Sequence, residues 1–255
     1  MDASSEHLHK FFEDLSFFKD MNDIDISNFI TKSNLKKYSK NQAIFVHGDE
    51  ADRFFIVFSG WVKLHRETPE GEEAVIGLLT RGDMFGDASI FCEAKYPFSA
   101  HCAEETQLIE ISASFLREKG KSDPKIMENL LSMMCHDMKA VRLENEHMAL
   151  MSTPQRVGCL LLQLSAGMVG KGGTFSFPYD KSLAATRLGM KPETFSRALA
   201  QLKPLGVSVK GSEITIDSYD DLVGYTCGHC SATPGECRKA ACCDHDCPKK
   251  KLCSA

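Results

Sequence analysis

The chain has 255 residues, 43 % of them hydrophobic, and a formal net charge of −5 at pH 7. It can therefore bury a sizeable core, and its length predicts about two globular domains. No run approaches the roughly 18 apolar residues that span a bilayer, and the acidic N-terminal stretch has no apolar signal segment, which argues against a membrane protein and against export. We expect a soluble cytoplasmic protein, in which eleven cysteines indicate thiols and metal thiolates rather than disulfides.

Residues 1 to about 30 predict a short helical lead that ends in an acidic turn at 20–25. Its apolar residues fall at helical spacing and are assigned to core packing: Phe11, Phe12, Leu15, Phe18 and Met21. From Leu35 to Ser112 the pattern changes to short apolar runs broken by glycine and acidic turns. These runs predict strands at 43–46, 54–58, 61–66, 74–79 and 108–111, with a hairpin turn at 68–71. Strands this short and closely spaced indicate a barrel or roll.

A helix of about 28 residues is predicted next, with residues 122–124 as its cap and first turn. Seven of its residues follow alternating spacings of four and three, which is a heptad seam and not the broader stripe of a helix on a globular core. The seam residues are Met127, Leu131, Met134, Met138, Val141, Asn145 and Met148. We predict a parallel homodimer whose register is fixed by the polar Asn145; the alternative is a core helix with a methionine-rich face. Residues 153–154 end this helix, and the next helix is expected at 155–168.

Two short amphipathic helices separated by a glycine turn follow, which predicts a helix-turn-helix. Asp180 can cap the first helix, which runs to about Leu188, because its carboxylate accepts the amide hydrogens of the first turn. Gly189 supplies the tight reversal, and Pro192 suits the opening turn of the second helix. The side of the second helix that should pack consists of Phe195, Ala198, Leu199 and Leu202.

The opposite side of the second helix carries the predicted DNA-reading residues, Glu193, Ser196 and Arg197. Arginine matches guanine O6 and N7, a carboxylate accepts from the cytosine amino group, and serine does either, so this trio suits a major groove. Lys191 and Thr194 complete the expected DNA-binding set. The alternative is an ordinary helical hairpin whose charges are merely solvated.

Local charge and the residues that follow favour DNA binding. Residues 181–210 contain one acid, Glu193, within a chain that is acidic as a whole. The six basic residues of this stretch are Lys181, Arg187, Lys191, Arg197, Lys203 and Lys210. Such local asymmetry suits contact with phosphates. Residues 207–216 then alternate apolar and polar around 210–212, which is a hairpin signal, so a winged helix-turn-helix is predicted.

A glycine-punctuated β-roll, a long dimer helix and a winged helix-turn-helix, in this order, resemble the Crp/Fnr superfamily of bacterial transcription regulators over roughly residues 10–220. The motifs that carry the resemblance are Ser59-Gly60, Pro69-Glu-Gly71, Gly82-Asp83, Phe85-Gly86 and the segment 192–197. Residues 193–197 are similar to the E-x-x-S-R reading motif of the Fnr branch. Residues 64–71 look like the Dnr-type nitric oxide regulators.

We expect an α+β fold in four parts. Three of them belong to the resemblance: a cyclic-nucleotide-binding-like β-roll (1–121), a dimerisation helix (122–152) and a winged helix-turn-helix (153–223). The fourth, a cysteine-rich tail (224–255), is an addition that the family core does not have. The resemblance further implies a homodimer that binds promoter DNA at TTGAT-like inverted repeats, with one half-site read by each subunit. RNA polymerase is the protein partner that it implies.

Two properties of the family do not transfer to these residues. Members that bind cyclic AMP hold its phosphate with a glycine-glutamate pair and an arginine-serine pair, whereas the corresponding segments here, 86–88 and 97–99, lack the arginine. A buried phosphate without that guanidinium would be left unpaired at a cost of several kcal/mol, which argues against cyclic AMP. The oxygen-sensing members use an N-terminal cysteine cluster, and this chain has no cysteine before Cys92.

Seven of the eleven cysteines lie in the last 29 residues, together with His229 and His245. They are Cys227, Cys230, Cys237, Cys242, Cys243, Cys247 and Cys253. Thiolates at this density bind soft or borderline metals, and we expect zinc or, preferably, an iron–sulfur cluster, which would give a redox or gas sensor a reactive centre. The first ligands expected are Cys227, Cys230 and Cys247, with Cys237, Cys242 or Cys243 as the fourth. The alternative is a disordered, thiol-rich tail.

Haem is the rival sensor group, because the Dnr-like resemblance implies it. The histidines available as axial ligands are His7, His9, His47, His65, His101, His136 and His147, and no pair of them has a diagnostic spacing. The remaining cysteines, Cys92, Cys102, Cys135 and Cys159, fit as small buried hydrophobes.

These observations predict a dimeric transcription regulator whose DNA affinity is set by a redox, oxygen or nitric oxide signal. The alternative is a metal-handling or electron-transfer protein in which the cysteine-rich tail is the working site. The sequence contains no nucleophile-base motif, no phosphate-cradling glycine loop and no HExxH zinc motif, so an enzyme is not expected.

Overall fold

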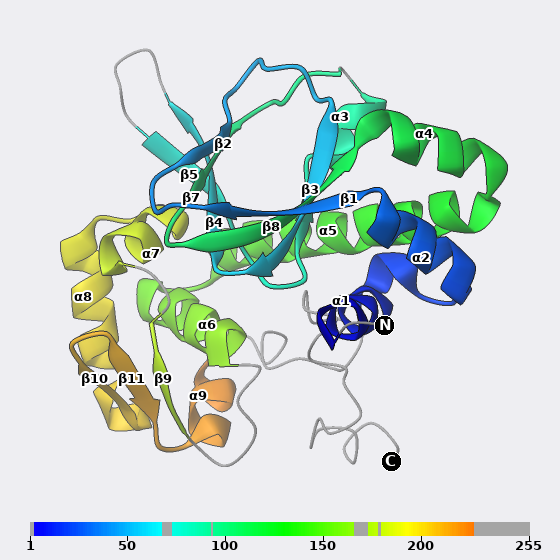
Figure 1. Ribbon diagram of the computed structural model, residues 1–255. Coiled ribbons are helices and arrows are strands. Elements are labelled where there is room, and N and C mark those ends of the chain that lie inside the picture. Colours follow the sequence, from blue (N-terminus) through cyan, green and yellow to red (C-terminus); the bar gives the residue numbers. More distant parts are fainter. Residues whose placement is uncertain (1–2, 68–72, 93, 166–172, 178–179, 227–255) are drawn as a thin grey trace. The chain divides into compact units, whose positions relative to one another are not determined.

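The computed structural model describes residues 3–67, 73–92, 94–165, 173–177 and 180–226 (Figure 1). It divides into two compact units, Met1–Cys135 and His136–Ala255. The boundary falls inside the longest helix, α5 (Pro124–Leu150), so this helix belongs to both units. Within the described ranges, none of the helices combines the length and the apolar character that crossing a bilayer would require.

The first unit is built around two four-stranded antiparallel sheets, with strand orders β1-β8-β3-β6 and β2-β7-β4-β5 (Figure 1). The strands are β1 (Ser33–Tyr38), β2 (Ala43–Phe45), β3 (Arg53–Ser59), β4 (Trp61–Glu67), β5 (Glu73–Thr80), β6 (Met84–Phe85), β7 (Ser99–Cys102) and β8 (Thr106–Ser112). A short helix, α3 (Asp87–Phe91), follows β6. All five predicted strands are present, and the roll is confirmed.

Three strands, β1, β6 and β7, lie outside the predicted set. Along β1 only Tyr38 is buried, so apolar and polar residues do not alternate in its sequence. The strand is stabilised instead by its pairing with β8 over six residues. β6 has two residues and is too short to leave a pattern. The predicted hairpin turn at 68–71 lies outside the described residues.

The two sheets pack around a common core. Phe55 of β3, Val62 of β4 and Ala100 of β7 are all buried in it. Phe45 and Tyr96 stack there with their ring centroids 3.7 Å apart. The interior of the roll is therefore closely filled by apolar and aromatic side chains.

A second core joins the N-terminal helices to the sheet of β3 and β8. The helices that contribute are α1 (Ala3–Glu13), the 3-10 turn η1 (Ser16–Phe18), α2 (Asp23–Thr31), α4 (Ala113–Ser122) and the first turns of α5. Of the five apolar residues assigned to core packing in the lead, four are buried and Met21 is partly buried, which confirms that assignment.

The predicted acidic turn at 20–25 is wrong for its second half, because α2 already begins at Asp23. The side-chain oxygen of Asn22 accepts a hydrogen bond from the backbone N–H of Asp25 at 2.9 Å and caps the helix. Asp23 and Asp25 then lie in the first turn, where the helix dipole stabilises negative charge. A capping asparagine followed by acids is thus the start of a helix here.

α5 has 27 residues and begins at Pro124, as predicted. The carboxylate of Asp123 accepts a hydrogen bond from the backbone N–H of Lys125 at 2.9 Å and supplies the predicted cap. Ile126 and Leu130 are buried in the first unit, which anchors the N-terminal turns of the helix.

The second unit combines the C-terminal half of α5 with short helices and a three-stranded antiparallel sheet of order β10-β11-β9 (Figure 1). Its elements are α6 (Thr153–Ser165), β9 (Gly173–Ser176), α7 (Lys181–Arg187), α8 (Pro192–Gln201), η2 (Lys203–Leu205), β10 (Val207–Lys210), β11 (Glu213–Ile216) and α9 (Tyr219–Tyr225). The helix-turn-helix and the wing hairpin are confirmed. The helix expected at 155–168 is α6, which begins two residues earlier and is described as far as Ser165; β9 and α9 were not predicted.

Candidate nucleic-acid interface

The start and the end of α7 follow from local chemistry. The Asp180 carboxylate accepts a hydrogen bond from the backbone N–H of Ser182 at 3.0 Å, as expected for an N-cap. Gly189 has a φ of +62°, in the left-handed region that glycine adopts without strain. The backbone N–H of Met190 then donates to the carbonyl of Ala185 at 3.0 Å. These contacts close the predicted turn between α7 and α8.

α8 divides into a buried side and an exposed side. Phe195 is fully buried, and Ala198, Leu199 and Leu202 lie with it in the core of the second unit, as predicted. Burial of a phenylalanine and two leucines contributes several kcal/mol, so the orientation of the helix about its own axis is fixed by packing.

The exposed side of α8 carries Glu193, Ser196 and Arg197. Lys191, at the N-cap, is also exposed, and Thr194 is partly buried. The Arg197 Nε donates to the backbone carbonyl of Glu193 at 3.4 Å, so the guanidinium lies along its own helix. The five predicted DNA-binding residues therefore lie within one segment of seven positions, and the three reading residues are exposed there.

The basic surface is smaller than the sequence count suggests. The guanidinium of Arg187 on α7 pairs with the carboxylate of Glu144 on α5, and only 17 % of the arginine side chain is exposed. Lys191, Lys203 and Lys210 are exposed, and in the described part of the chain they make no ion pair. Arg187 thus has an internal role, whereas these three lysines are open to phosphates.

The wing is a three-stranded sheet because β9 adds to the predicted hairpin. The hydroxyls of Thr174 on β9 and Thr215 on β11 lie 2.8 Å apart. Ile214 of β11 is fully buried in the same core as α8. Lys210 and Gly211 form the exposed tip, where the glycine has a φ of +61°. The wing and α8 therefore share one core.

Arg156 on α6 makes a contact that the sequence analysis did not predict. Its guanidinium donates to the backbone carbonyl of Leu188, the C-cap residue of α7. Burial lowers the pKa of Arg156, as expected for a cation shielded from water. The sequence does single out this arginine, because Arg156 is the one charged residue of α6.

Two domain families match the chain. The cyclic nucleotide-binding domain matches residues 35–123, and the Crp-like helix-turn-helix domain matches residues 155–225. These ranges contain the roll and the helix-turn-helix with its wing, in the order of the Crp/Fnr regulators. The chain belongs to the Crp/Fnr family. It is a DNA-binding transcription regulator of the Crp/Fnr type.

Several Crp/Fnr relatives cover most of the chain. The CRP-like cAMP-activated global transcriptional regulator of Mycobacterium tuberculosis is 27 % identical over 189 residues, which is 72 % of this chain and 84 % of that protein. The fumarate and nitrate reduction regulatory protein of Yersinia pestis is 28 % identical over 197 residues, covering 73 % and 76 %. The structure of FixK2 from Bradyrhizobium japonicum has a TM-score of 0.69 at 20 % identity, covers 79 % of this chain and 99 % of that one, and shows likeness of fold alone. Both sequence relatives are named as regulators and not as enzymes.

Among its described residues, the roll of this Crp/Fnr protein offers no buried cation to a cyclic nucleotide phosphate. The Ser99 hydroxyl already accepts a hydrogen bond from the backbone N–H of His47 at 3.1 Å. Phe45 and Tyr96 stack in the interior, and among the described residues no lysine or arginine is buried. A desolvated phosphate needs a cation. The fold is that of a cyclic nucleotide-binding domain, and the absence of cyclic AMP stays a prediction.

The seven seam residues of α5 are all exposed in the single chain. The exposed fractions of the six apolar residues run from 37 % for Met127 to 64 % for Leu131, and Asn145 is exposed with them. Among the described residues this methionine-rich face belongs to no core cluster, which disfavours the alternative of a core helix, and the homodimer stays a prediction. An exposed apolar stripe of this length is typical of a surface that another protein covers.

The predicted metal ligands from Cys227 to Cys253, with the two histidines among them, lie outside the described residues. Of the other cysteines, Cys102 and Cys159 are buried, as predicted. Cys92 and Cys135 are exposed, so the expectation of burial was wrong for these two. Cys92 ends the short helix α3 at the surface, and Cys135 lies on the part of α5 that carries the exposed seam.

Proposed function

We propose that this Crp/Fnr protein binds TTGAT-like inverted repeats in promoters as a homodimer, in the cytoplasm, and acts there on RNA polymerase. The observation that carries the proposal is the exposure of Glu193, Ser196 and Arg197 on a helix whose other side is fixed in a core. A recognition helix reads base edges with residues near its N-terminus, and these residues occupy the second, fifth and sixth positions of α8.

A homodimer formed through α5 would fit this proposal geometrically. Helix-turn-helix dimers read two half-sites whose centres lie about 34 Å, or one helical turn, apart. A twofold axis along the seam of α5 would supply two copies of α8 to such a site, one for each half-repeat. The exposed stripe from Met127 to Met148 is the surface through which the two copies would meet.

The test is binding to a duplex that carries two TTGAT half-sites as an inverted repeat, measured by fluorescence anisotropy over a series of salt concentrations. Arg197→Ala is expected to weaken binding by about 1–3 kcal/mol and to relax the preference at one base pair of each half-site. Lys210→Ala, at the wing tip, is the matched control. It should weaken binding to every sequence alike and reduce the salt slope by about one unit.

Two results would contradict the assignment of the reading residues. If Arg197→Ala weakened binding to all duplexes equally, the arginine would contact phosphate and not a base. If the wild-type protein bound the repeat no better than a scrambled duplex, the TTGAT preference would be lost, although DNA binding itself would stand.

We further propose that the signal is redox, oxygen or nitric oxide, and that the cysteine-rich tail holds the responding centre. Relatives named for anaerobic regulation and for fumarate and nitrate reduction support the class of signal. In the described ranges no three metal-binding side chains that include a cysteine lie together, so a thiolate centre would draw on residues 227–253. Zinc or an iron–sulfur cluster would suit these thiolates, and such a centre would supply the redox-active or gas-reactive chemistry.

The test of the tail is the absorption spectrum and the iron, sulfide and zinc content of protein purified without oxygen. The same measurements on a chain truncated after Gly224 are the comparison. Iron and sulfide that disappear on truncation would support a sensing cluster. Zinc alone would make the tail structural and direct the search to haem loading of the roll, and an absence of all metals would overturn the tail as a metal sensor.

A further inference from the structure

Histidines and acids gather on one face of the β2-β7-β4-β5 sheet. Along β4, Val62 and Leu64 are buried in the roll, so the alternate residues face the other way. His65 of β4 is only 2 % exposed on that face. Beside it lie His101 from β7 and Glu73 from β5, which the sheet register brings together from distant parts of the sequence.

The hydrogen bonding of His65 is incomplete on one side. Its Nε2 lies 2.9 Å from the Nδ1 of His101, so that nitrogen is engaged. Its Nδ1 is inaccessible to solvent and makes no hydrogen bond, although it lies 3.4 Å from the Oε2 of Glu73. When the Nε2–H donates to His101, a lone pair on Nδ1 faces a carboxylate oxygen. Two acceptors in that position repel each other unless a proton or a metal ion lies between them.

The distances suit a bound metal ion. Metal bonds of about 2.0–2.2 Å place neighbouring donor atoms on one ion about 3–3.5 Å apart in tetrahedral or octahedral geometry, and the Nδ1 of His65 and the Oε2 of Glu73 are separated by 3.4 Å. Glu67 adds a third oxygen, and one donor atom from each of the three residues lies within 4.8 Å of the others. The second nitrogen of His65 is held by His101, in the way that ligating histidines are commonly oriented.

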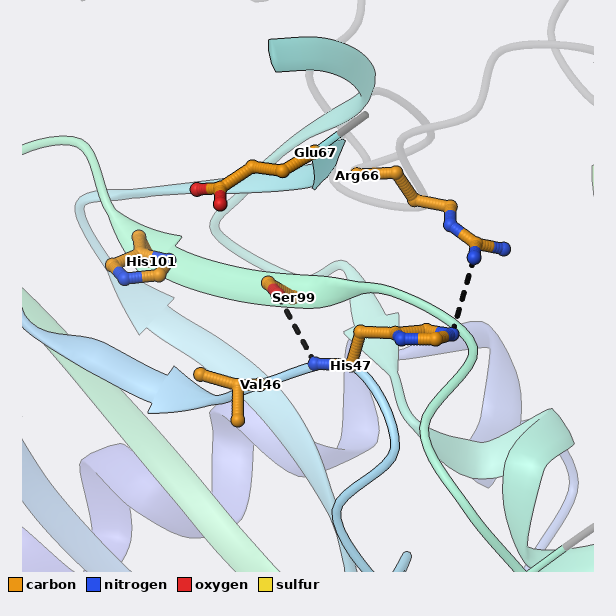
Figure 2. A pocket seen from close by; sticks show the side chains of 6 residues that line it. All are labelled: Val46, His47, Arg66, Glu67, Ser99 and His101. Atoms are coloured by element: carbon orange, nitrogen blue, oxygen red, sulfur yellow. Dashed lines mark hydrogen bonds between the residues drawn. The ribbon is translucent and has the colours of Figure 1, made fainter. Parts of the chain in front are cut away.

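A pocket opens beside this cluster. It has a volume of about 390 Å³ and shares Glu67 and His101 with the cluster, and its other walls are Val46, His47, Arg66 and Ser99. Figure 2 shows Glu67 and His101 toward one end and the guanidinium of Arg66 above His47 at the other, where they are 3.2 Å apart. The pocket is therefore adjacent to the cluster and is lined by Glu67, one of its three donor residues, and by His101.

We propose that His65, Glu73 and Glu67 form a divalent metal site on the roll, with His101 as the residue that orients the His65 ring. The site would take a first-row ion that accepts nitrogen and oxygen ligands. Burial and the neighbouring Lys63 lower the pKa of both histidines, which keeps the imidazoles in the neutral form that binds metals. The proposed site uses no residue of the cysteine-rich tail and none of the predicted DNA-binding residues.

Lys63 now occupies part of this site. Its ammonium lies 2.5 Å from the same Oε2 of Glu73, so it would have to move away when a metal ion binds. Its side chain is already 21 % exposed and can turn toward solvent. A metal ion would therefore replace one cation by another. Consequently, removal of Lys63 should tighten metal binding, whereas a lysine that only stabilised the fold would not have this effect.

A second group of acids and a histidine provides the control. His9, Glu13 and Asp23 also have donor atoms within 4.8 Å of one another. Both acids are exposed, and in the ranges that the structure describes no buried nitrogen lacking a hydrogen bond belongs to that group. Weak surface association with divalent ions would depend on this group as much as on the proposed site.

The experiment is a titration of the full chain with Mn²⁺, in which free Mn²⁺ is followed by electron paramagnetic resonance. Mn²⁺ is the probe because it prefers carboxylates to thiolates, so the thiolates of the tail compete little for it. One saturable site is expected. Glu73→Gln should weaken it at least tenfold, His101→Leu should weaken it about 10- to 100-fold as a positioning residue, Lys63→Met should strengthen it severalfold, and Glu13→Gln should leave it unchanged.

Three outcomes would overturn the proposal. These are no saturable binding by the wild-type chain, equal binding by the Glu73→Gln variant, and loss of binding in the Glu13→Gln variant instead. In the first two cases the His65 Nδ1 carries its proton toward Glu73 and the two form an ordinary pair. Glu73 is 35 % exposed, so its conservative variant should fold, and thermal unfolding of each variant without metal checks this.

Discussion

Met138 on α5 offers the sharpest test of the dimer. Half of this side chain is exposed in the single chain. Burial of a whole methionine contributes about 1.5–3 kcal/mol, so covering the exposed half should contribute about 1 kcal/mol. Each seam residue occurs twice in a twofold-symmetric dimer, which makes about 2 kcal/mol for the pair. Met138→Lys removes this contribution and places two ammonium groups across the seam.

The repulsion between those groups adds to the loss. Two like charges about 8 Å apart repel by about 2 kcal/mol at an effective dielectric constant of 20, and salt reduces this value. Met138→Lys should therefore destabilise the dimer by about 3–4 kcal/mol, which raises its dissociation constant about 100- to 1,000-fold. Sedimentation velocity over a range of protein concentrations measures it directly.

Ser132→Lys is the matched control for this change. Ser132 is exposed on the same helix but lies next to the seam residue Leu131, on the outward side of the heptad. It adds the same charge without entering the predicted contact, so the dimer should persist. The reasoning is refuted if both lysine variants weaken association equally, or if Met138→Lys leaves the dissociation constant unchanged.

Three further predictions concern the packing of the chain. Glu144→Gln should lower the free energy of unfolding by about 1–2 kcal/mol, measured with denaturant, because its partly buried pair with Arg187 is lost; a difference that high salt does not reduce would argue against an ionic origin. Phe195→Ala should lower the same free energy by about 3–5 kcal/mol through a cavity behind α8, and an unchanged midpoint would contradict the packing. Burial raises the pKa of Cys102 to about 11, so in the native protein iodoacetamide should modify exposed Cys92 well before Cys102, as mass spectrometry of the peptides can show; equal rates would refute this.

The helix-turn-helix could be predicted from the sequence because its signals are local. Asp180 caps the helix that it precedes, Gly189 makes its own turn, and the period of α8 already separates Phe195 from Arg197. The same holds for the start of α5 at Pro124. In each case the residues that decide the structure are within a few positions of one another.

Contacts between distant residues could not be predicted in this way. His65 and His101 are 36 positions apart and meet only because β4 and β7 are neighbours in a sheet. Strand β9 pairs with β11 across some forty positions, and its four residues give no alternation of their own. The sequence analysis placed Arg187 on the basic surface, because its partner Glu144 lies 43 positions away and no local pattern indicates the pair.

The pair of Glu144 and Arg187 links the proposed dimer surface to the proposed reading surface. Glu144 lies between Val141 and Met148 of the seam, on the same turns of α5. Arg187 is the last residue of α7, and the turn at Gly189 joins α7 directly to α8. A rotation of α5 at the seam would therefore move or break this ion pair. Its arginine lies only two residues before Gly189, where the turn to α8 is made. If α5 carries a signal, Glu144→Gln should reduce the difference in DNA affinity between the two signalling states more than it reduces DNA affinity itself. An equal loss in both states would mean that the pair stabilises the fold and transmits nothing.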